Sequence, residues 1–174
     1  MKAIKKSLAF LVCICLVFSC MAMSVFAAET TGSITIQNPS NSAATVAGKT
    51  FNIYKIFDAT TSGNNTSYSW HVHENDEIPF YDFFYGEWTN KEGQTVPGVL
   101  GKQENGNVQG AVEHVANITK SLDLSQFAES LHKYIIDTGI ETHIDPVTAE
   151  DTDTYVNIPG LSYGYYLVYD ATTL

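Results

Sequence analysis

The chain has 174 residues, of which 44% are hydrophobic, so it is long enough and apolar enough to bury a sizeable core. It contains nine lysines, no arginine and 19 acidic residues, and its net charge at pH 7 is −10. A charge of this sign repels phosphate backbones and anionic membranes, which excludes nucleic-acid binding.

The first 27 residues have the three-part layout of a secretory signal peptide. A lysine-rich start precedes the uncharged run Leu8–Phe18, and small residues stand at Ala27 and Ala28. We therefore predict a signal peptide over residues 1–27, cleaved between Ala27 and Ala28, and export from the cell. Two alternatives stay open. Residues 8–28 form an apolar span of 21 residues that could anchor the chain in a bilayer, and Cys20 loosely fits a lipoprotein signal.

The exported part, residues 28–174, has the size of a single domain. Removal of the first 27 residues takes away three of the nine lysines and none of the 19 acids, so the remaining 147 residues carry a net charge of −13. All three cysteines lie in the leader, and the exported part therefore has no thiol for a disulfide. Its stability must come from core burial or from another covalent link.

The first half of this domain is patterned as strands. Alternation predicts a first strand over Gly32–Gln37, which ends at the turn residues of Asn38–Ser42. The segment Phe51–Asp58 has apolar residues on both faces, which is typical of a central strand covered on both sides. A polar turn over residues 60–65 predicts a hairpin to a third strand, Ser67–His73. One face of the central strand would carry Phe51, Ile53 and Phe57, and the other would carry Tyr54 and Ile56.

The middle of the domain changes character twice. The run Ile78–Trp88 is rich in aromatic residues, which form either core or a ligand groove. Glycine, glutamine and asparagine over residues 93–110 predict loops or short hairpins. From Ser121 the apolar period becomes helical, and Gly139 is placed to end the helix. The apolar face of this helix would consist of Leu124, Phe127, Ala128, Leu131 and Ile135.

The chain returns to strands at its end. Thr154–Ile158 is followed by a Pro159-Gly160 turn and by a closing strand, Tyr163–Asp170. Many short strands with one helix predict a mainly β fold, an Ig-like β-sandwich with one amphipathic helix packed on it.

Three of these segments resemble one family: Gly32–Ile36, Phe51–Asp58 and Asn157–Val168. Together they are similar to the N-terminal domain of the Gram-positive isopeptide-forming fimbrial proteins, the shaft pilins. The resemblance covers nearly all of residues 28–174, which we expect to be the pilin N-terminal β-sandwich domain of a longer multidomain subunit. It implies a cell wall-attached pilus whose subunits are joined by a sortase, so that sister pilin subunits and the sortase are the expected partners. The LPxTG-type signal and the acceptor lysine after a proline are not found in the chain, and we expect them beyond Leu174.

An intramolecular isopeptide bond is a second feature that the family resemblance implies. Such a bond needs an unprotonated lysine amine, an Asn or Asp carbonyl, and a carboxylic acid kept neutral by burial. In a related collagen-adhesin module the lysine ends the first strand, where this chain has Gln37, although Asp170 matches the acid position. Lys55 is the remaining candidate amine, with Asn157 as its partner. The alternative is a Lys55 stem that lies along the sheet while its ammonium reaches solvent.

Other candidate sites have weaker signals. His71 and His73 would share one strand face and are weak metal candidates, although an exposed strand face explains them equally well. We expect no cofactor. The exported part contains no cysteine and none of the hydrolase, zincin or phosphate-loop motifs, so we expect a protein that is not an enzyme. An adhesin or minor tip pilin that binds a host or carbohydrate ligand is the main alternative, and a secreted enzyme is the third.

Overall fold

The computed structural model describes residues 31–38, 45–75, 77–104, 106–118 and 124–172. The predicted signal peptide, its cleavage site at Ala27 and Ala28, and both alternatives for that segment lie outside the described residues. Strand residues outnumber helical residues, which confirms a mainly β fold with several antiparallel sheets. Within the described ranges, none of the helices combines the length and the apolar character that a membrane span requires.

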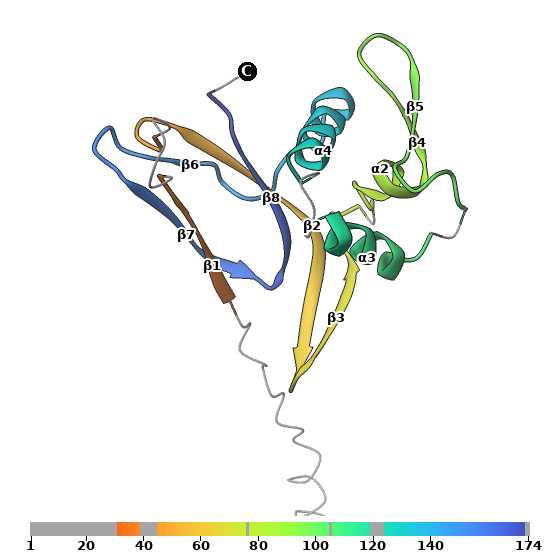
Figure 1. Cartoon of the computed structure of the whole chain (residues 1–174), viewed down its shortest axis with the longest axis horizontal. Coiled ribbons are helices and arrows are strands. Elements are labelled where there is room, and N and C mark those ends of the chain that lie inside the picture. Colours follow the sequence, from red (N-terminus) through yellow and green to blue (C-terminus); the bar gives the residue numbers. More distant parts are fainter. Residues whose placement is uncertain (1–30, 39–44, 76, 105, 119–123, 173–174) are drawn as a thin grey trace, which may run out of the picture. The chain divides into compact units, whose positions relative to one another are not determined.

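The largest sheet is built around one long strand, β2 (Thr50–Ser62) (Figure 1). Strand β8 (Gly164–Asp170) pairs antiparallel along one edge of β2. The other edge is shared by two strands, β3 (Asn65–Trp70) and β6 (Val147–Thr148), which pair with opposite ends of β2. No described strand pairs with the middle of this edge, which forms one wall of a pocket.

Two smaller antiparallel pairs complete the strands. β1 (Thr31–Gln37) pairs with β7 (Tyr155–Ser162), and β7 leads directly into β8. β4 (Glu87–Thr89) and β5 (Thr95–Pro97) form a separate short hairpin. The β1–β7 pair lies on one side of the β2 sheet, while the helices and the β4–β5 hairpin lie on the other (Figure 1).

The described chain has three helices: α2 (Tyr81–Tyr85), α3 (Val108–Ile118) and α4 (Leu124–Thr138). In α4 the buried residues are Leu131, Tyr134 and Ile135, whereas Leu124, which the spacing assigned to the apolar face, is 45% exposed. The helix α3 was not expected, because residues 93–110 were predicted to form only loops or short hairpins. Burial of Ala111, Val112 and Val115 outweighs the weak helix propensity of its polar start.

The two sides of the β2 sheet bury different kinds of side chain. The aliphatic core lies toward β1 and β7 and consists of Val46, Phe51, Ile53, Ala149, Val156, Ile158 and Leu161. The aromatic core lies toward the helices and contains Tyr54, Ile56, Phe57, Phe80, Phe83, Phe84, Tyr85, Ala111, Val112, Val115, Leu131, Tyr134 and Ile135. The aromatic run is thus core rather than a ligand groove.

One predicted position on β2 is wrong. Phe57 was assigned to the face of Phe51 and Ile53, but it lies in the aromatic core on the opposite side. The reason is a β-bulge: Lys55 pairs with Tyr166 and Phe57 pairs with Tyr165, so Ile56 is an extra residue on β2. Because side chains alternate with period two, one inserted residue reverses the faces of those that follow.

Candidate functional site

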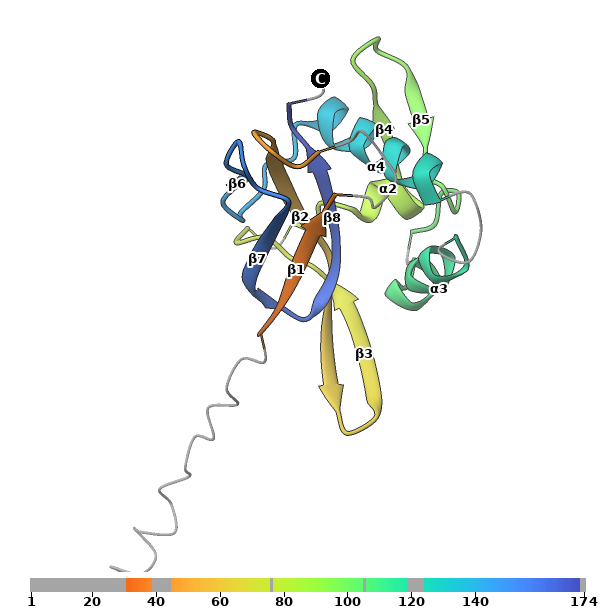
Figure 2. The ribbon, with the colours of Figure 1, turned by 60° about the vertical axis from the view of Figure 1, so that its left-hand side comes forward.

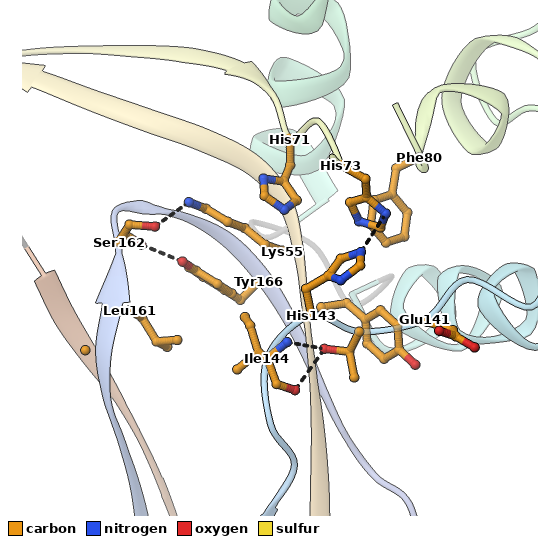
Figure 3. Close-up of a pocket in the computed structure, with 13 residues that line it drawn as sticks. Lys55, His71, His73, Phe80, Glu141, His143, Ile144, Leu161, Ser162 and Tyr166 are labelled. Atoms are coloured by element: carbon orange, nitrogen blue, oxygen red, sulfur yellow. Dashed lines mark hydrogen bonds between the residues drawn. The ribbon is translucent and has the colours of Figure 1, made fainter. Parts of the chain in front are cut away.

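A pocket of about 260 Å³ opens where the bulge of β2, the segment after β3, the loop before β6 and the β7–β8 turn meet (Figure 3). We call it the histidine pocket. Its volume lies below the roughly 300 Å³ at which sites for drug-sized ligands begin, so it has room for an ion or a small polar group. It is lined by Tyr54, Lys55, His71, His73, Phe80, Glu141, Thr142, His143, Ile144, Gly160, Leu161, Ser162 and Tyr166.

The pocket forms because loops replace a strand along the open edge of β2. The Thr142 hydroxyl donates a hydrogen bond to the Ile53 carbonyl and accepts one from the Ile144 N–H at 3.1 Å. On the same edge the His71 N–H donates to the Ile56 carbonyl at 3.4 Å. Backbone carbonyls of β2 that would face a strand are thus satisfied by these two loops, which carry the histidines into the pocket.

Lys55 is buried at the inner end of the pocket, on the Phe51 and Ile53 side of β2. Its ammonium donates to Ser162 Oγ at 2.5 Å, forms an ion pair with Asp58, and lies 5.7 Å from the centre of the Tyr166 ring. In a regular strand, residues three apart point to opposite faces, and the bulge is what brings Asp58 to the side of Lys55. The ion pair of Lys55 with Asp58 leaves no net charge at this end of the pocket.

Asp58 also contacts His71, whose Nδ1 lies 3.0 Å from Asp58 Oδ2. Burial alone would raise the pKa of Asp58, but hydrogen bonds from Lys55 and His71 outweigh it and lower that pKa. Asp58 is therefore a carboxylate and can only accept a hydrogen bond. In the neutral imidazole of His71 the proton then lies on Nδ1 and the lone pair on Nε2.

His73 and His143 face each other at the mouth of the pocket (Figure 3). His143 Nε2 lies 3.0 Å from His73 Nδ1, and the rings are nearly perpendicular with their centres 4.1 Å apart. Burial lowers the pKa of His73, as do His143 and His71, while Glu77 opposes the shift. His73 is therefore a neutral imidazole at neutral pH.

The two histidines proposed from sequence do not share a strand face. β3 ends at Trp70, and beyond it His71 turns to Asp58 while His73 turns to His143. His143 was not a sequence candidate, because it lies 70 residues from His73 and has no local motif. In the ranges that the structure describes, no group of three or more His, Cys, Asp or Glu side chains is arranged to hold a metal ion.

The three isopeptide candidates lie apart, each with its own partners. Asn157 is exposed on β7 and accepts a hydrogen bond from Thr35 Oγ1 at 3.2 Å, while Lys55 bonds to Asp58 and Ser162. Asp170 pairs with Phe51, four residues along β2 from Lys55, a separation of about 13 Å along the strand. Lys55 therefore contacts neither of the other two candidates.

Asp170 has a different lysine beside it. Its Oδ2 lies 2.5 Å from Lys49 Nζ, and the hydroxyl and backbone N–H of Thr172 donate to its Oδ1. Burial alone would raise the pKa of Asp170, but these bonds outweigh it and lower the pKa to about 2. Asp170 is thus ionised at neutral pH, whereas the isopeptide reaction needs a protonated acid.

The chemistry available to the histidine pocket follows from these groups. The Lys55 ammonium is neutralised by Asp58, so the inner end does not attract an anion. The facing nitrogens of His73 and His143 are the groups that could hold a cation. Neither a family model nor any curated protein or solved structure in three separate comparisons matches this chain.

Proposed function

We propose that this domain is a structural subunit domain of a sortase-assembled surface pilus. The observation that carries the proposal is the path of the chain through the strands. Thr31 pairs with Ser162 beside the β7–β8 turn, whereas Asp170 lies at the far end of β8. The start of β1 and the end of β8 are therefore separated by about the length of β8, roughly 20 Å (Figure 2).

This path suits a domain that transmits tension. Force applied between Thr31 and Asp170 acts along β1 and β8, parallel to the strands. It loads the hydrogen bonds of β1 with β7 and of β8 with β2 together, in shear, because these bonds lie perpendicular to antiparallel strands. Subunits joined end to end in a fibre experience tension in this direction.

The architecture we propose for the domain is an Ig-like β-sandwich. The β1–β7 pair faces the β2 sheet across the aliphatic core, which is the arrangement of two small packed sheets. On the other face of the β2 sheet, α4 serves as the amphipathic helix that covers the aromatic core. The helices α2 and α3 extend this covering layer.

The proposal extends to location and partners. The chain would be exported, joined by a sortase to sister pilin subunits, and held at the cell wall, with an architectural and not a catalytic role. The adhesin alternative draws no support from the aromatic run, because Phe80, Phe83 and Phe84 are buried. The motifs at Gly32–Ile36 and Asn157–Val168 belong to the strands that would carry tension.

Single-molecule pulling tests the mechanical role. The exported part contains no cysteine, so pairs of engineered cysteines define the pulling axis uniquely. We expect Thr31→Cys with Thr172→Cys to unfold at a force several-fold higher than Gln37→Cys with Tyr155→Cys. The residues of the second pair face each other at one end of the β1–β7 pair, so pulling on them separates its bonds one at a time. Equal forces along the two axes would contradict a tension-bearing path.

A further inference from the structure

The facing pair His73 and His143 joins two segments that are distant in sequence. A neutral imidazole has one N–H and one lone pair, so two facing ring nitrogens can be satisfied in only two ways. They can share a proton, or they can share a cation. The 3.0 Å separation of His73 Nδ1 and His143 Nε2 is compatible with either.

The separation is closer to one coordination geometry than to another. Bonds of about 2.05 Å from a metal to two imidazole nitrogens place those nitrogens about 2.9 Å apart at a right angle and about 3.3 Å apart at the tetrahedral angle. The observed 3.0 Å matches the right angle of square-planar or octahedral coordination, which Cu²⁺ and Ni²⁺ prefer. Tetrahedral Zn²⁺ would require the pair to open by about 0.3 Å.

His71 supplies a third nitrogen beside this pair. Its ring centre lies 5.6 Å from that of His73, and its Nδ1 is held by Asp58 at 3.0 Å. A carboxylate bonded to the second nitrogen of a histidine fixes its tautomer and raises its basicity, as is usual for metal-binding histidines. Because Nδ1 is occupied by Asp58, Nε2 of His71 is the nitrogen available to a ligand.

The charges around the pair favour a cation. Glu77 and Glu141 line the cavity that His73 and His143 border on its outer side. Lys55, the cation at the inner end, is neutralised by Asp58. A divalent ion at the mouth of the histidine pocket therefore meets a surplus of carboxylates.

We propose that the histidine pocket binds one divalent transition-metal ion through His73 Nδ1 and His143 Nε2. Because no three ligating side chains are already arranged around one point in the described part of the chain, His71 becomes the third protein ligand after a side-chain rotation. Water would complete the coordination. The bound ion would tie the segment after β3 to the loop before β6, across the open edge of β2.

Titration with CuCl₂, NiCl₂ and ZnCl₂ tests the site. The exported protein is titrated by calorimetry, and quenching by Cu²⁺ is followed through Trp70, the residue before His71. We expect one ion per chain, with Cu²⁺ bound most tightly. We expect His73→Gln and His143→Gln each to weaken binding at least about 10-fold.

The chain offers matched controls in its two remaining described histidines. His114 contacts Phe127 and His132 lies against Tyr169, so neither belongs to the pocket. The variants His114→Gln and His132→Gln should bind Cu²⁺ like the unchanged protein. Circular dichroism identifies any variant that fails to fold, and electron paramagnetic resonance of the Cu²⁺ complex should show coupling to two or three imidazole nitrogens. Binding that survives in the His73→Gln, His143→Gln double variant, or a Cu²⁺ spectrum without nitrogen coupling, would overturn the proposal.

Discussion

The two sides of β2 are packed in different ways although they belong to one strand. The aliphatic core is made mainly of branched side chains from strands, among them Ile53, Val156 and Ile158. The aromatic core contains many rings, which come from the helical half of the chain and from Tyr54 and Phe57 of β2. The centre of the Phe57 ring lies 5.3 Å from that of Trp70, 5.5 Å from that of Phe84 and 5.9 Å from that of Tyr165.

The bulge at Lys55–Phe57 changes which positions of β2 face which core. Before it, Phe51 and Ile53 point to the aliphatic core, and after it Phe57 points to the aromatic core. The same irregularity brings Asp58 to Lys55, which lines the histidine pocket. One extra residue thus reverses the faces of the positions that follow it and places an ion pair beside the pocket.

The largest expected effect is in the aromatic core. Phe57→Ala removes a fully buried ring and should lower the free energy of unfolding by about 3–5 kcal/mol, because the surrounding rings cannot collapse into the space. Urea denaturation followed by circular dichroism measures it. Tyr155→Ala, at a residue that is 61% exposed, is the control and should change stability by less than about 0.5 kcal/mol. A loss below about 1 kcal/mol for Phe57→Ala would mean that the aromatic side is loosely packed.

The bulge itself is tested at Gly164, which lies opposite Asp58. A Cβ at this position would stand 2.3 Å from the Phe57 carbonyl oxygen and 2.7 Å from Lys55 Cε. Gly164→Ala should therefore cost about 1–3 kcal/mol, since the strands must move apart. Gly32→Ala is the matched control, because its nearest atom would be at 3.8 Å. If both variants unfold at the same urea concentration, the close approach of β8 to the bulge is not real.

A smaller effect is expected on the aliphatic side. Ile53→Val removes one methyl group from a fully buried residue and should cost about 0.5–1.5 kcal/mol. The same urea experiment compares its loss in the free energy of unfolding with that of Phe57→Ala, and so compares the two sides of β2. A loss for Ile53→Val that matches the loss for Phe57→Ala would remove the distinction between the two cores.

The smallest expected effect is electrostatic and depends on pH. Asp170 has a pKa of about 2 in the folded protein, whereas an unfolded aspartate has a pKa of about 3.9. A lowered pKa means that the contribution of this pair to stability is present above about pH 4 and is lost as the pH falls toward 2. Asp170→Asn should cost up to about 1 kcal/mol at pH 7, because the pair with Lys49 is only partly buried.

Urea titrations of this variant and the unchanged protein at several pH values provide the check. Their difference in the free energy of unfolding should shrink as the pH falls from 4 to 2. An equal difference at pH 7 and pH 2 would show that the Asp170 carboxylate does not stabilise the fold through its charge.

The strands could be predicted from the sequence because alternation is a local signal. The first and closing strands, expected at Gly32–Gln37 and Tyr163–Asp170, agree with β1 and β8 within one residue. The helix α3 could not be predicted, because Gly110 interrupts its pattern and its stability comes from burial against the aromatic core. The aromatic run was predicted to form either core or a ligand groove. Only the burial of α2 in the structure shows that it forms core.

The candidate site was predicted less well than the fold. Lys55, His71 and His73 were singled out by residue type, and all three line the histidine pocket. Their partners were not found, because a bulge that reverses the side of Asp58 leaves no trace in a hydrophobic pattern. His143 is brought in by a loop that fills a gap in the sheet, which is a property of the tertiary structure.

Covalent polymerisation is the central claim about function, and one measurement tests it most directly. Cell-wall extracts of the producing bacterium are boiled in detergent and reductant, separated by electrophoresis, and probed with an antibody raised against residues 31–172. If the domain belongs to a sortase-assembled pilus, the antibody should detect a ladder of high-mass species that disappears when the sortase gene is inactivated. A single species at the mass of one subunit, unchanged by loss of the sortase, would contradict the account.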